Sequence, residues 1–314
     1  MKKTKQTINI AYTVDDKYID YMGVSLYSLK KNRSLDYSYE IYVLYNNGHV
    51  SEENKKRIYS LKEKDFDIIF VDVEKNLKLL EGKLKTRDYY SLTTYYRLFL
   101  PHIFPNLDKI LYLDCDTVVL GDISELYNTE LHDTYLACAP DEAVLAIPVF
   151  QKYVEEVIGV KKYDEYFNAG IILMNLNKFR KDKIFEKFMD LNDKYYFIVA
   201  QDQDLLNVLC AGNVTYYDRG WNKNPTEGVV PYKKLNLIHY HLTMKPWHYD
   251  GIMFSDIFWD YAKQTIFYDN IVYEKEHFSD EDRKKEEEST PLLFEKAQME
   301  IDNENNFKRK FLNK

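Results

Sequence analysis

The triplet Asp114-Cys115-Asp116 places two carboxylates one residue apart, directly after an apolar run. That run, Lys109 to Leu113, is typical of a buried central strand. In a continuing strand, residues i and i+2 share one face, so both carboxylates would converge on one point. Paired carboxylates without a cation repel each other, and a divalent metal removes that cost. Asp-x-Asp alone is a common string that usually forms a solvated turn, but the strand before it favours a metal site.

A second group of candidate ligands lies far downstream. Three histidines, His239, His241 and His248, fall within ten positions that also include Lys245. A lone histidine is more often a surface or core residue than a ligand. Two carboxylates and one imidazole, with open positions, suit an octahedral Mn²⁺ or Mg²⁺ completed by phosphate oxygens, and the imidazole favours manganese. Lys245 would then neutralise diphosphate charge that the metal leaves over.

Two further polar segments stand next to expected elements. Gln201-Asp202-Gln203-Asp204 opens an apparent helix, where simple N-capping is an adequate explanation. Asn168-Ala169-Gly170 precedes an apolar strand, and its small residues would let a bulky ligand approach the backbone.

These residues need a framework, and strand-like and helical segments alternate along the first part of the chain. This alternation predicts an α/β fold with a mostly parallel sheet and helices on both faces. Residues 144–163 are mixed and of uncertain type. The expected helices cover 18–30, a segment capped by Ser51, 93–100 (ended by Pro101 and Pro105), 182–192 and 205–210. The expected strands cover 8–14, 39–45, 67–73, 109–113, 135–139, 170–174 and 235–239.

The composition changes near residue 255, which predicts a catalytic domain over 1–255 and a helical, charged extension over 256–314. Residues 280–288 form a dense charge run, and Pro291 is expected at the first position of a new helix. The last residues, from Phe307 to Leu312, mix basic and aromatic side chains. They could rest on an anionic membrane surface, or pack on the domain.

The whole composition excludes several classes of protein. The 314 residues carry a formal net charge of -8, which argues against a general nucleic-acid binder. Three widely spaced cysteines form neither a disulfide framework nor a zinc-finger pattern and fit a reducing compartment. No apolar run is long enough to span a bilayer. We therefore expect a cytoplasmic protein, peripheral to the inner face of the membrane at most.

Taken together, six stretches in order resemble the family 8 glycosyltransferases, retaining enzymes of the GT-A fold that include bacterial lipooligosaccharide galactosyltransferases and glycogenin. The resemblance spans roughly residues 8 to 249. The stretches are Ala11–Tyr18, Ser91–Leu98, Leu111–Val119, Phe167–Ile171, Asp202–Asp204 and His239–Trp247.

The resemblance implies a role for each matched residue. Thr13, Asp15 and Tyr18 would hold the uridine of a UDP-sugar, and Arg97 would contact the donor sugar or its phosphates. Asp202 would hydrogen-bond the sugar hydroxyls, with Gln203 on the β-face of the anomeric carbon. The metal ligands would be Asp114, Asp116 and His239, the sugar pocket Asn168, Ala169 and Gly170, and the diphosphate contact Lys245.

The chain departs from the family at two positions. Lys17 stands where some relatives have an asparagine near the nucleotide. Leu242 replaces a glycine that approaches the diphosphate, so the loop after His239 is expected to follow another path.

The expected reaction is transfer of a hexose, glucose or galactose, to a saccharide or to a lipid- or protein-linked glycan. Because Gln203 is a neutral amide and a poor nucleophile, same-face substitution is favoured over a covalent intermediate. A sugar-nucleotidyltransferase is the main rival, but it usually has a glycine-rich loop where this chain has Thr13-Val14-Asp15-Asp16. A nuclease or phosphatase is disfavoured by the negative charge, and a non-catalytic binding module would not need Asp114, Asp116 and His239.

Overall fold

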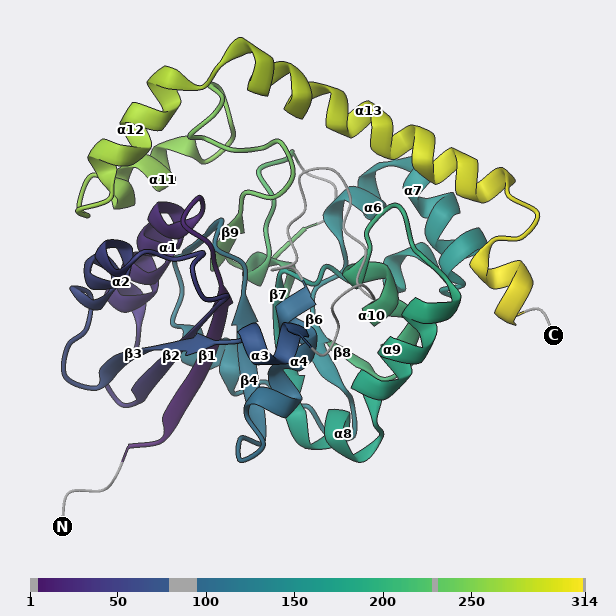
Figure 1. Ribbon diagram of the computed structural model, residues 1–314, viewed down its shortest axis with the longest axis horizontal. Helices are drawn as coiled ribbons and strands as arrows, with labels where there is room; N and C mark the ends of the chain where they lie inside the picture. Colours follow the sequence, from purple (N-terminus) through teal and green to yellow (C-terminus); the bar gives the residue numbers. More distant parts are fainter. Residues whose placement is uncertain (1–4, 79–94, 228–230, 313–314) are drawn as a thin grey trace.

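The computed structural model describes residues 5–78, 95–227 and 231–312, and within them the main sheet has seven strands in the order β3-β2-β1-β4-β7-β6-β8. Every neighbouring pair is parallel except the two that involve β7, which runs antiparallel to β4 and to β6. The predicted mostly parallel sheet is confirmed (Figure 1). The strands are β1 (Thr7–Thr13), β2 (Ser38–Tyr45), β3 (Phe66–Asp72), β4 (Lys109–Leu113), β6 (Leu136–Cys138), β7 (Ile171–Asn175) and β8 (Val214–Tyr216).

The sheet is covered by helices on both faces because successive strand residues point to opposite sides. In β4, Leu111 and Leu113 pack in one apolar cluster, while Ile110 and Tyr112 pack in the other. The first cluster includes residues of α1 (Ile19–Asn32), α5 (Ile123–Tyr127), α11 (Ser255–Ala262) and α12 (Tyr268–His277). The second includes residues of α4 (Tyr96–Ile103), α6 (Glu142–Ala146), α7 (Pro148–Tyr153), α8 (Leu176–Lys181), α9 (Ile184–Lys194), α10 (Asp202–Cys210) and α13 (Asp280–Asp302).

Two short helices, α2 and α3, follow strands β2 and β3. Ser51 caps α2 (Glu52–Tyr59), as predicted: its hydroxyl accepts from the backbone N–H of Asn54 at 3.3 Å. The described part of α3 is Glu74–Lys78. The segment of uncertain type after residue 144 holds α6, α7, a π-helix at Val154–Ile158 and a 3₁₀ turn at Tyr163–Glu165; a further 3₁₀ turn covers Arg219–Trp221.

The helix expected over 93–100 ends three residues later than predicted. The first residues of the expected helix lie outside the described part of the chain, and α4 continues through Pro101 to Ile103. Pro101 has no N–H to donate within the helix. Arg180 donates to the carbonyl oxygens of Pro101 and Phe104 at 3.1 and 3.0 Å.

A second, two-stranded sheet carries the residues after the aspartate triplet. Strand β5 (Thr117–Val119) pairs antiparallel with β9 (Leu237–His239), and Thr117 lies opposite His239. The strand expected over 235–239 therefore exists, but outside the main sheet. Its pairing brings a histidine from late in the chain next to the carboxylates.

The C-terminal part is helical, as expected, but its longest helix begins earlier than predicted. Helix α13 starts at the N-cap Ser279, whose hydroxyl accepts from the N–H of Asp282 at 3.1 Å, and Pro291 lies in its interior. The prediction that Pro291 opens a new helix is wrong. A proline inside a helix leaves one carbonyl without its donor. Pro291 is exposed, so water can take the place of that donor.

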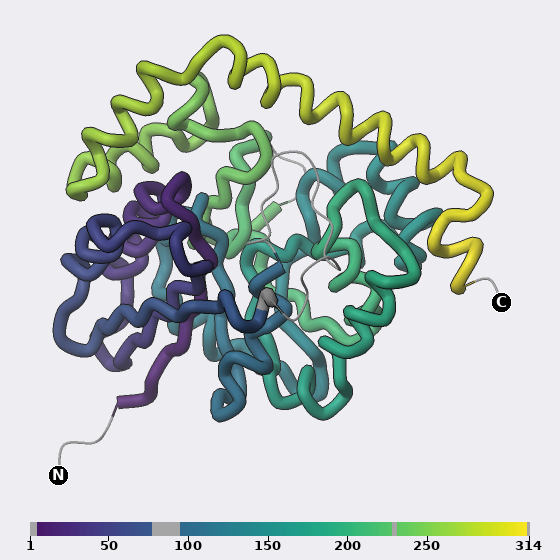
Figure 2. Tube along the Cα trace, viewed as in Figure 1, coloured from purple at the N-terminus to yellow at the C-terminus, as the bar shows by residue number. Residues whose placement is uncertain are grey.

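Helix α13 crosses the top of the molecule in Figure 1 and ends beside α7, and the tube in Figure 2 shows the same path. Its buried residues, Leu293, Ala297 and Ile301, recur every four positions and face the second apolar cluster. Beyond it, Phe307 is buried between the rings of Tyr195 and Phe197 before the final turn at Lys308–Leu312. Among the described helices, none has the length and apolar character needed to cross a membrane.

Between β9 and α13, His248 joins the two C-terminal helices to the sheet region. Its Nδ1 lies 2.9 Å from Oε1 of Glu286 on α13, and its Nε2 lies 3.5 Å from Oε1 of Glu274 on α12. The ring stacks on Phe278 with centroids 3.9 Å apart. Burial alone would lower the pKa of His248, but the hydrogen bonds and charges of the two glutamates together raise it.

This contact predicts a pH-dependent contribution to stability. A histidine whose pKa is raised by folding stabilises the protein fully below its unfolded pKa of about 6.5, and the contribution disappears as pH rises through the folded value. We expect His248→Gln to lower the free energy of unfolding by on the order of 1 kcal/mol at pH 6 and by less at pH 9. Urea unfolding at both pH values measures this. The exposed His132→Gln is the matched control, and an equal loss at both pH values would contradict the prediction.

Candidate functional site

One cavity of about 350 Å³ lies at the carboxyl ends of β1 and β4, the edge at which open α/β sheets bind ligands. All the residues to which the family resemblance gave a role line it, whereas His248, the third of the candidate histidines, does not and pairs with Glu274 and Glu286 instead. The structure thus brings together Thr13, Asp15, Tyr18, Arg97, Asp114, Asp116, Asn168, Ala169, Gly170, Asp202, Gln203, His239 and Lys245.

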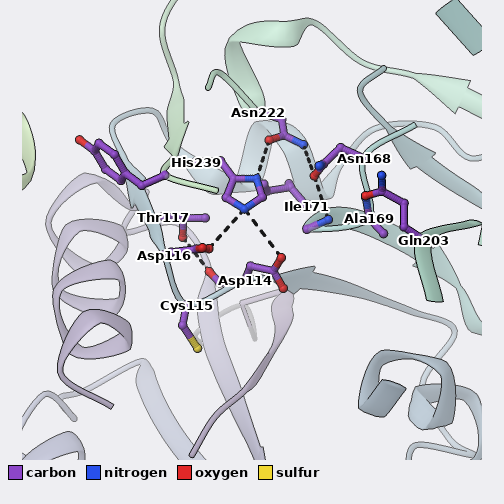
Figure 3. A network of polar contacts seen from close by, with 12 residues as sticks. Asp114, Cys115, Asp116, Thr117, Asn168, Ala169, Ile171, Gln203, Asn222 and His239 are labelled. Carbon is purple, nitrogen blue, oxygen red and sulfur yellow. Dashed lines mark hydrogen bonds and ion pairs between the residues drawn. The ribbon is translucent and has the colours of Figure 1, made fainter. Parts of the chain in front are cut away.

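The group that could hold a metal ion consists of Asp114, Asp116 and His239. Their ligand atoms all lie within 4.8 Å of one another. The imidazole Nε2 is 3.2 Å from Oδ1 of Asp116 and 3.7 Å from Oδ2 of Asp114. The carboxylates do not belong to a continuing strand: β4 ends at Leu113, and the triplet forms the loop that leads into β5. They converge because this loop and β9 face each other (Figure 3).

Asn222 fixes the tautomer of the histidine. Its Nδ2 donates to Oδ1 of Asn168 at 3.0 Å, and its Oδ1 lies 3.0 Å from Nδ1 of His239 (Figure 3). Because the amide oxygen accepts, Nδ1 of His239 must carry the proton, which leaves the lone pair of Nε2 directed toward the two carboxylates. This is the arrangement of a metal-ligating histidine, whose other nitrogen donates to a neighbouring oxygen.

Asn222 is held in place by a buried ion pair beside it. Lys223 Nζ lies 2.9 Å from Oε2 of Glu142, and both side chains are almost fully buried. The same carboxylate oxygen accepts from the backbone N–H of Asn224 at 3.1 Å. In turn, the backbone N–H of His239 donates to the carbonyl oxygen of Lys223 at 2.9 Å. The segment after β8 is thus fixed against β9.

Gly170 permits the close approach of two of the candidate metal ligands, Asp114 and His239. A Cβ atom at this position would lie 2.4 Å from Cε1 of His239 and 2.6 Å from Oδ2 of Asp114. Both distances are shorter than real Cβ contacts. The sequence singled out Gly170 for approach to a ligand; here it makes room for two side chains of the site itself.

Cys115 faces away from the two aspartates that flank it. Its thiol donates to the carbonyl oxygen of Thr13 at 3.0 Å, and Figure 3 shows its sulfur on the side opposite His239. Burial, reinforced by the neighbouring carboxylates, raises the pKa of the thiol well above its ordinary value. Cys115 is thus a buried spacer between the two candidate ligands.

Lys245 pairs with Asp116. Its ammonium group contacts Oδ2 of Asp116 and the carbonyl oxygen of Tyr240, and it lies 5.5 Å from the ring centroid of Trp247. Burial would raise the pKa of Asp116, but the charge of Lys245 holds it well below its ordinary value. Asp116 is therefore ionised at neutral pH.

Arg97 lies between the carboxylates of Asp114 and Asp202. Its guanidinium lies 3.3 Å from Oδ1 of Asp114 and 3.1 Å from Oδ2 of Asp202, and it also donates to the carbonyl oxygen of Ala169. It stacks over the ring of Tyr112 at 4.5 Å. Burial, together with the charge of Asp114, raises the pKa of Asp202 to about 6, although Arg97 opposes the shift.

Gln203 is held by three neighbours. Its Oε1 accepts from the backbone N–H of Ala169 at 2.9 Å, and its Nε2 donates to Oδ2 of Asp141 at 3.1 Å and to the hydroxyl of Tyr166 at 3.3 Å. The same oxygen of Asp141 accepts from Nδ2 of Asn168 at 3.0 Å. The amide is thus fixed, with its oxygen turned toward the backbone.

The loop after β1 forms the other end of the cavity. The hydroxyl of Thr13 bonds that of Tyr112 at 2.8 Å. Oδ1 of Asp15 accepts from the backbone N–H groups of Lys17 and Tyr18 at 3.1 and 3.2 Å. Tyr18, which lines this end of the cavity, is 39% exposed.

Leu242, where relatives have glycine, adopts a left-handed backbone with φ at 54°. This conformation is one that glycine adopts readily and a leucine rarely does. A different path of the loop was expected here, yet the backbone retains a glycine-like conformation. The leucine side chain lines the cavity instead.

Sequence reasoning missed Asn222 and Asp141. Asp141 doubles as the N-cap of α6, with its Oδ1 accepting from the N–H groups of Ala143 and Val144. An N-cap signal was readable at that position, but nothing in the sequence pattern linked it to Gln203 or Asn168. Asn222 has no sequence signal of its own, because its role depends on the tertiary approach of β9.

A model of the family described as "Glycosyl transferase family 8" matches residues 9–251. The chain belongs to glycosyltransferase family 8. The expectation from the six sequence stretches is confirmed, and with it the assignment as a transferase.

Individual relatives agree with this assignment. The chain is 34% identical, over 78% of its length and 72% of the relative's, to a Haemophilus influenzae protein whose name places it among the glycosyltransferases. It is 32% identical, over 78% of its length and 74% of the relative's, to the lipopolysaccharide 1,2-glucosyltransferase of Escherichia coli K12. The solved structure of the galactosyltransferase LgtC with donor and acceptor sugar analogues superposes with a TM-score of 0.68 at 27% identity, covering 82% of this chain and 96% of that one.

The hydrogen bond from His239 to Asn222 predicts a positioning role that can be measured. We expect Asn222→Ala to weaken Mn²⁺ binding by roughly 10- to 100-fold, because His239 loses the acceptor that fixes its tautomer. Asn222→Asp retains an acceptor for Nδ1 and should recover most of the affinity. Titration of the protein with Mn²⁺ by electron paramagnetic resonance measures both. Equal weakening in the two variants would show that Asn222 acts only through packing.

Proposed function

We propose that this family 8 enzyme is a metal-dependent, retaining hexosyltransferase that uses a UDP-sugar. It would move glucose or galactose to a hydroxyl of a saccharide or of a lipid- or protein-linked glycan. The observation that carries the proposal is the convergence of Asp114, Asp116 and His239 in the cavity that also contains the candidate donor-binding residues.

The donor set suits a divalent cation. Two carboxylates and one neutral imidazole nitrogen leave coordination positions for phosphate oxygens, as manganese and magnesium sites require. Asn222 and Gly170 support this reading, since the first presents the lone pair of His239 and the second leaves the space. When bound, the cation would stabilise the negative charge that develops on the leaving diphosphate.

The loop after β1 suits the nucleoside. The partly exposed ring of Tyr18 offers a stacking surface for uracil. Thr13 and Asp15 line the same end of the cavity and would bind the uridine by hydrogen bonds. Lys245, buried beside Asp116, supplies a fixed positive charge for the diphosphate.

The donor sugar would lie among the polar groups at the centre of the cavity. Arg97 and Asp202 face it from one side, and Asn168, Ala169 and Gly170 form another wall. Burying sugar hydroxyls requires hydrogen-bond partners, and these groups supply them. Arg97 contacts both Asp114, in the loop that carries the candidate metal ligands, and Asp202, on the sugar side of the cavity.

Retention is best explained by substitution on a single face. Asp202, paired with Arg97, and Gln203, a neutral amide, are both poor nucleophiles. The acceptor oxygen would bond to the anomeric carbon as the bond to the diphosphate oxygen breaks, and the acceptor proton would pass to that departing oxygen. Gln203 would contribute its amide dipole on the opposite face of the sugar ring.

Two rival functions remain less well supported. A sugar-nucleotidyltransferase does not explain the family 8 match over residues 9–251. A non-catalytic UDP-sugar-binding protein would not require a tautomer-fixed histidine beside two carboxylates. The first experiment below distinguishes both from a transferase.

UDP-glucose and UDP-galactose hydrolysis should require Mn²⁺ and stop on addition of a chelator. Asp114→Asn and Asp116→Asn should each lower the rate by about 100-fold or more, because each removes a charged metal ligand. Asp133→Asn, whose side chain is 94% exposed, is the control and should behave like the native protein. NMR of the released sugar should show the α-anomer first. No metal-dependent hydrolysis of either UDP-sugar would refute the proposal.

Gln203→Ala should lower turnover but leave measurable activity, because the amide assists the reaction without forming a bond. Steady-state kinetics and mass spectrometry of the quenched enzyme provide the measurement. Complete loss of activity together with a glycosyl adduct trapped on Asp202 would instead indicate a covalent intermediate.

A further inference from the structure

The cavity contains a second, apolar section beyond the polar groups assigned to the donor. Its walls come from α6, α7, the π-helix, the loop before α10, and α13. Among the described residues, the side chains that form this section are uncharged, and each is less than a tenth exposed. The residues are Val144, Phe150, Tyr153, Val154, Val199 and Leu293; we call this set the apolar recess.

The aromatic hydroxyls at the recess are already engaged. Tyr153 donates to Oδ2 of Asp204 at 2.9 Å, and Tyr166 donates to Oδ1 of the same carboxylate at 2.7 Å. Asp204 is fully buried and also accepts from the N–H of Ala200 at 2.9 Å. A sugar hydroxyl placed in the recess would therefore exchange water for an apolar wall, which is unfavourable for each hydroxyl left unpaired.

Leu293 reaches the recess because of the buried stripe on α13. Leu293 lies on the buried face of that helix, whereas its neighbour Leu292 is 38% exposed. Phe294 packs on Phe150 with ring centroids 5.3 Å apart, so the helix and α7 form one wall. Figure 1 shows α13 passing over α6 and α7. The C-terminal helix is thus part of the cavity that holds the candidate metal ligands.

The position of the recess points to the acceptor and not to the donor. The polar groups from Arg97 to Asp202 offer partners to the hydroxyl groups of a hexose. The recess adjoins Gln203: Val199 precedes Ala200, whose carbonyl oxygen accepts from the backbone N–H of Gln203, and the hydroxyl of Tyr166 accepts from its Nε2. Its outer wall, Leu293, lies outside the segment shared by the family, which ends at residue 251. Because this wall lies outside the segment that the family shares, we assign it to the acceptor and not to the donor.

We propose that the apolar recess binds an alkyl or aryl group carried by the acceptor, so that the preferred acceptor is a glycoside with an apolar substituent and not a free sugar. This inference rests on the proposed glycosyltransferase function. Each methylene buried in the recess should tighten acceptor binding roughly three- to fourfold, until the recess is filled.

The test compares methyl, p-nitrophenyl and octyl glycosides of glucose and galactose, below their micellar concentrations, with protein that holds UDP and Mn²⁺. We expect the octyl or p-nitrophenyl compounds to bind at least tenfold more tightly than the methyl compounds in calorimetric titrations. They should also raise the rate of UDP release from the UDP-sugar. Equal binding of all three classes would overturn the inference while leaving metal-dependent hydrolysis, and hence the proposed function, intact.

Two variants locate the effect. Leu293→Asn should reduce the ratio of octyl to methyl affinity toward one, and Val144→Phe should do the same by filling the recess. Leu292→Asn, on the exposed side of the same helix, is the matched control and should keep the native ratio. Thermal unfolding of each variant shows whether it is folded, and Val144→Phe preserves the test should Leu293→Asn unfold.

The remaining outcomes are also decisive. A native ratio in both recess variants would overturn the inference. So would a preference for a UDP-sugar with an N-acetyl group that is lost in both variants, since the recess would then belong to the donor. Absence of hydrolysis of any UDP-sugar would overturn the proposed function and the inference together.

Discussion

The site depends on the pairing of β5 with β9. This short antiparallel ladder sets Thr117 opposite His239 and so places an imidazole beside carboxylates that precede it by more than a hundred residues. Two backbone contacts extend the pairing: Tyr240 donates to the carbonyl oxygen of Asp116, and His239 donates to that of Lys223. Because backbone hydrogen bonds fix the strands, the ligand atoms need little side-chain ordering to converge. The cavity lies at the edge of the main sheet, and the small sheet positions His239, the third candidate metal ligand.

Convergence of carboxylates has an electrostatic cost, and the surrounding residues offset only part of it. Asp114, Asp116 and Asp202 face two buried cations, Arg97 and Lys245, so an excess of negative charge remains. Burial raises the pKa of Asp202, which shares Arg97 with Asp114, whereas Lys245 lowers the pKa of Asp116 against the effect of burial. A divalent cation between Asp114 and Asp116 would neutralise the excess. The same charges would then favour a diphosphate that brings negative charge to the metal.

Local sequence signals were enough to predict most of the strands, several helices and the candidate residues around the cavity, because buried strands and helix caps are encoded over a few neighbouring positions. Strands β5 and β8 and helices α5 and α8 were not predicted. Pro291 looked like a helix start, but the Ser279 cap and the stripe from Leu293 to Ile301 stabilise a longer helix. The glycine-like φ of Leu242 is likewise not predicted by its residue type. Asn222 and Asp141 act only through residues that the fold brings to them, which no local pattern reveals.

Helix α13 belongs to the predicted C-terminal extension but packs on the main part of the molecule. Charge and composition suggested an appendage after residue 255, yet α13 contributes Leu293 to the central cavity and buries Ala297 and Ile301 in the same apolar cluster as α7 and α10. His248 contacts the beginning of this helix, and Phe307 anchors the chain just beyond its end. A helix fixed at both ends is a rigid wall. Because the family match ends before α13, this wall lies outside the segment that the family shares.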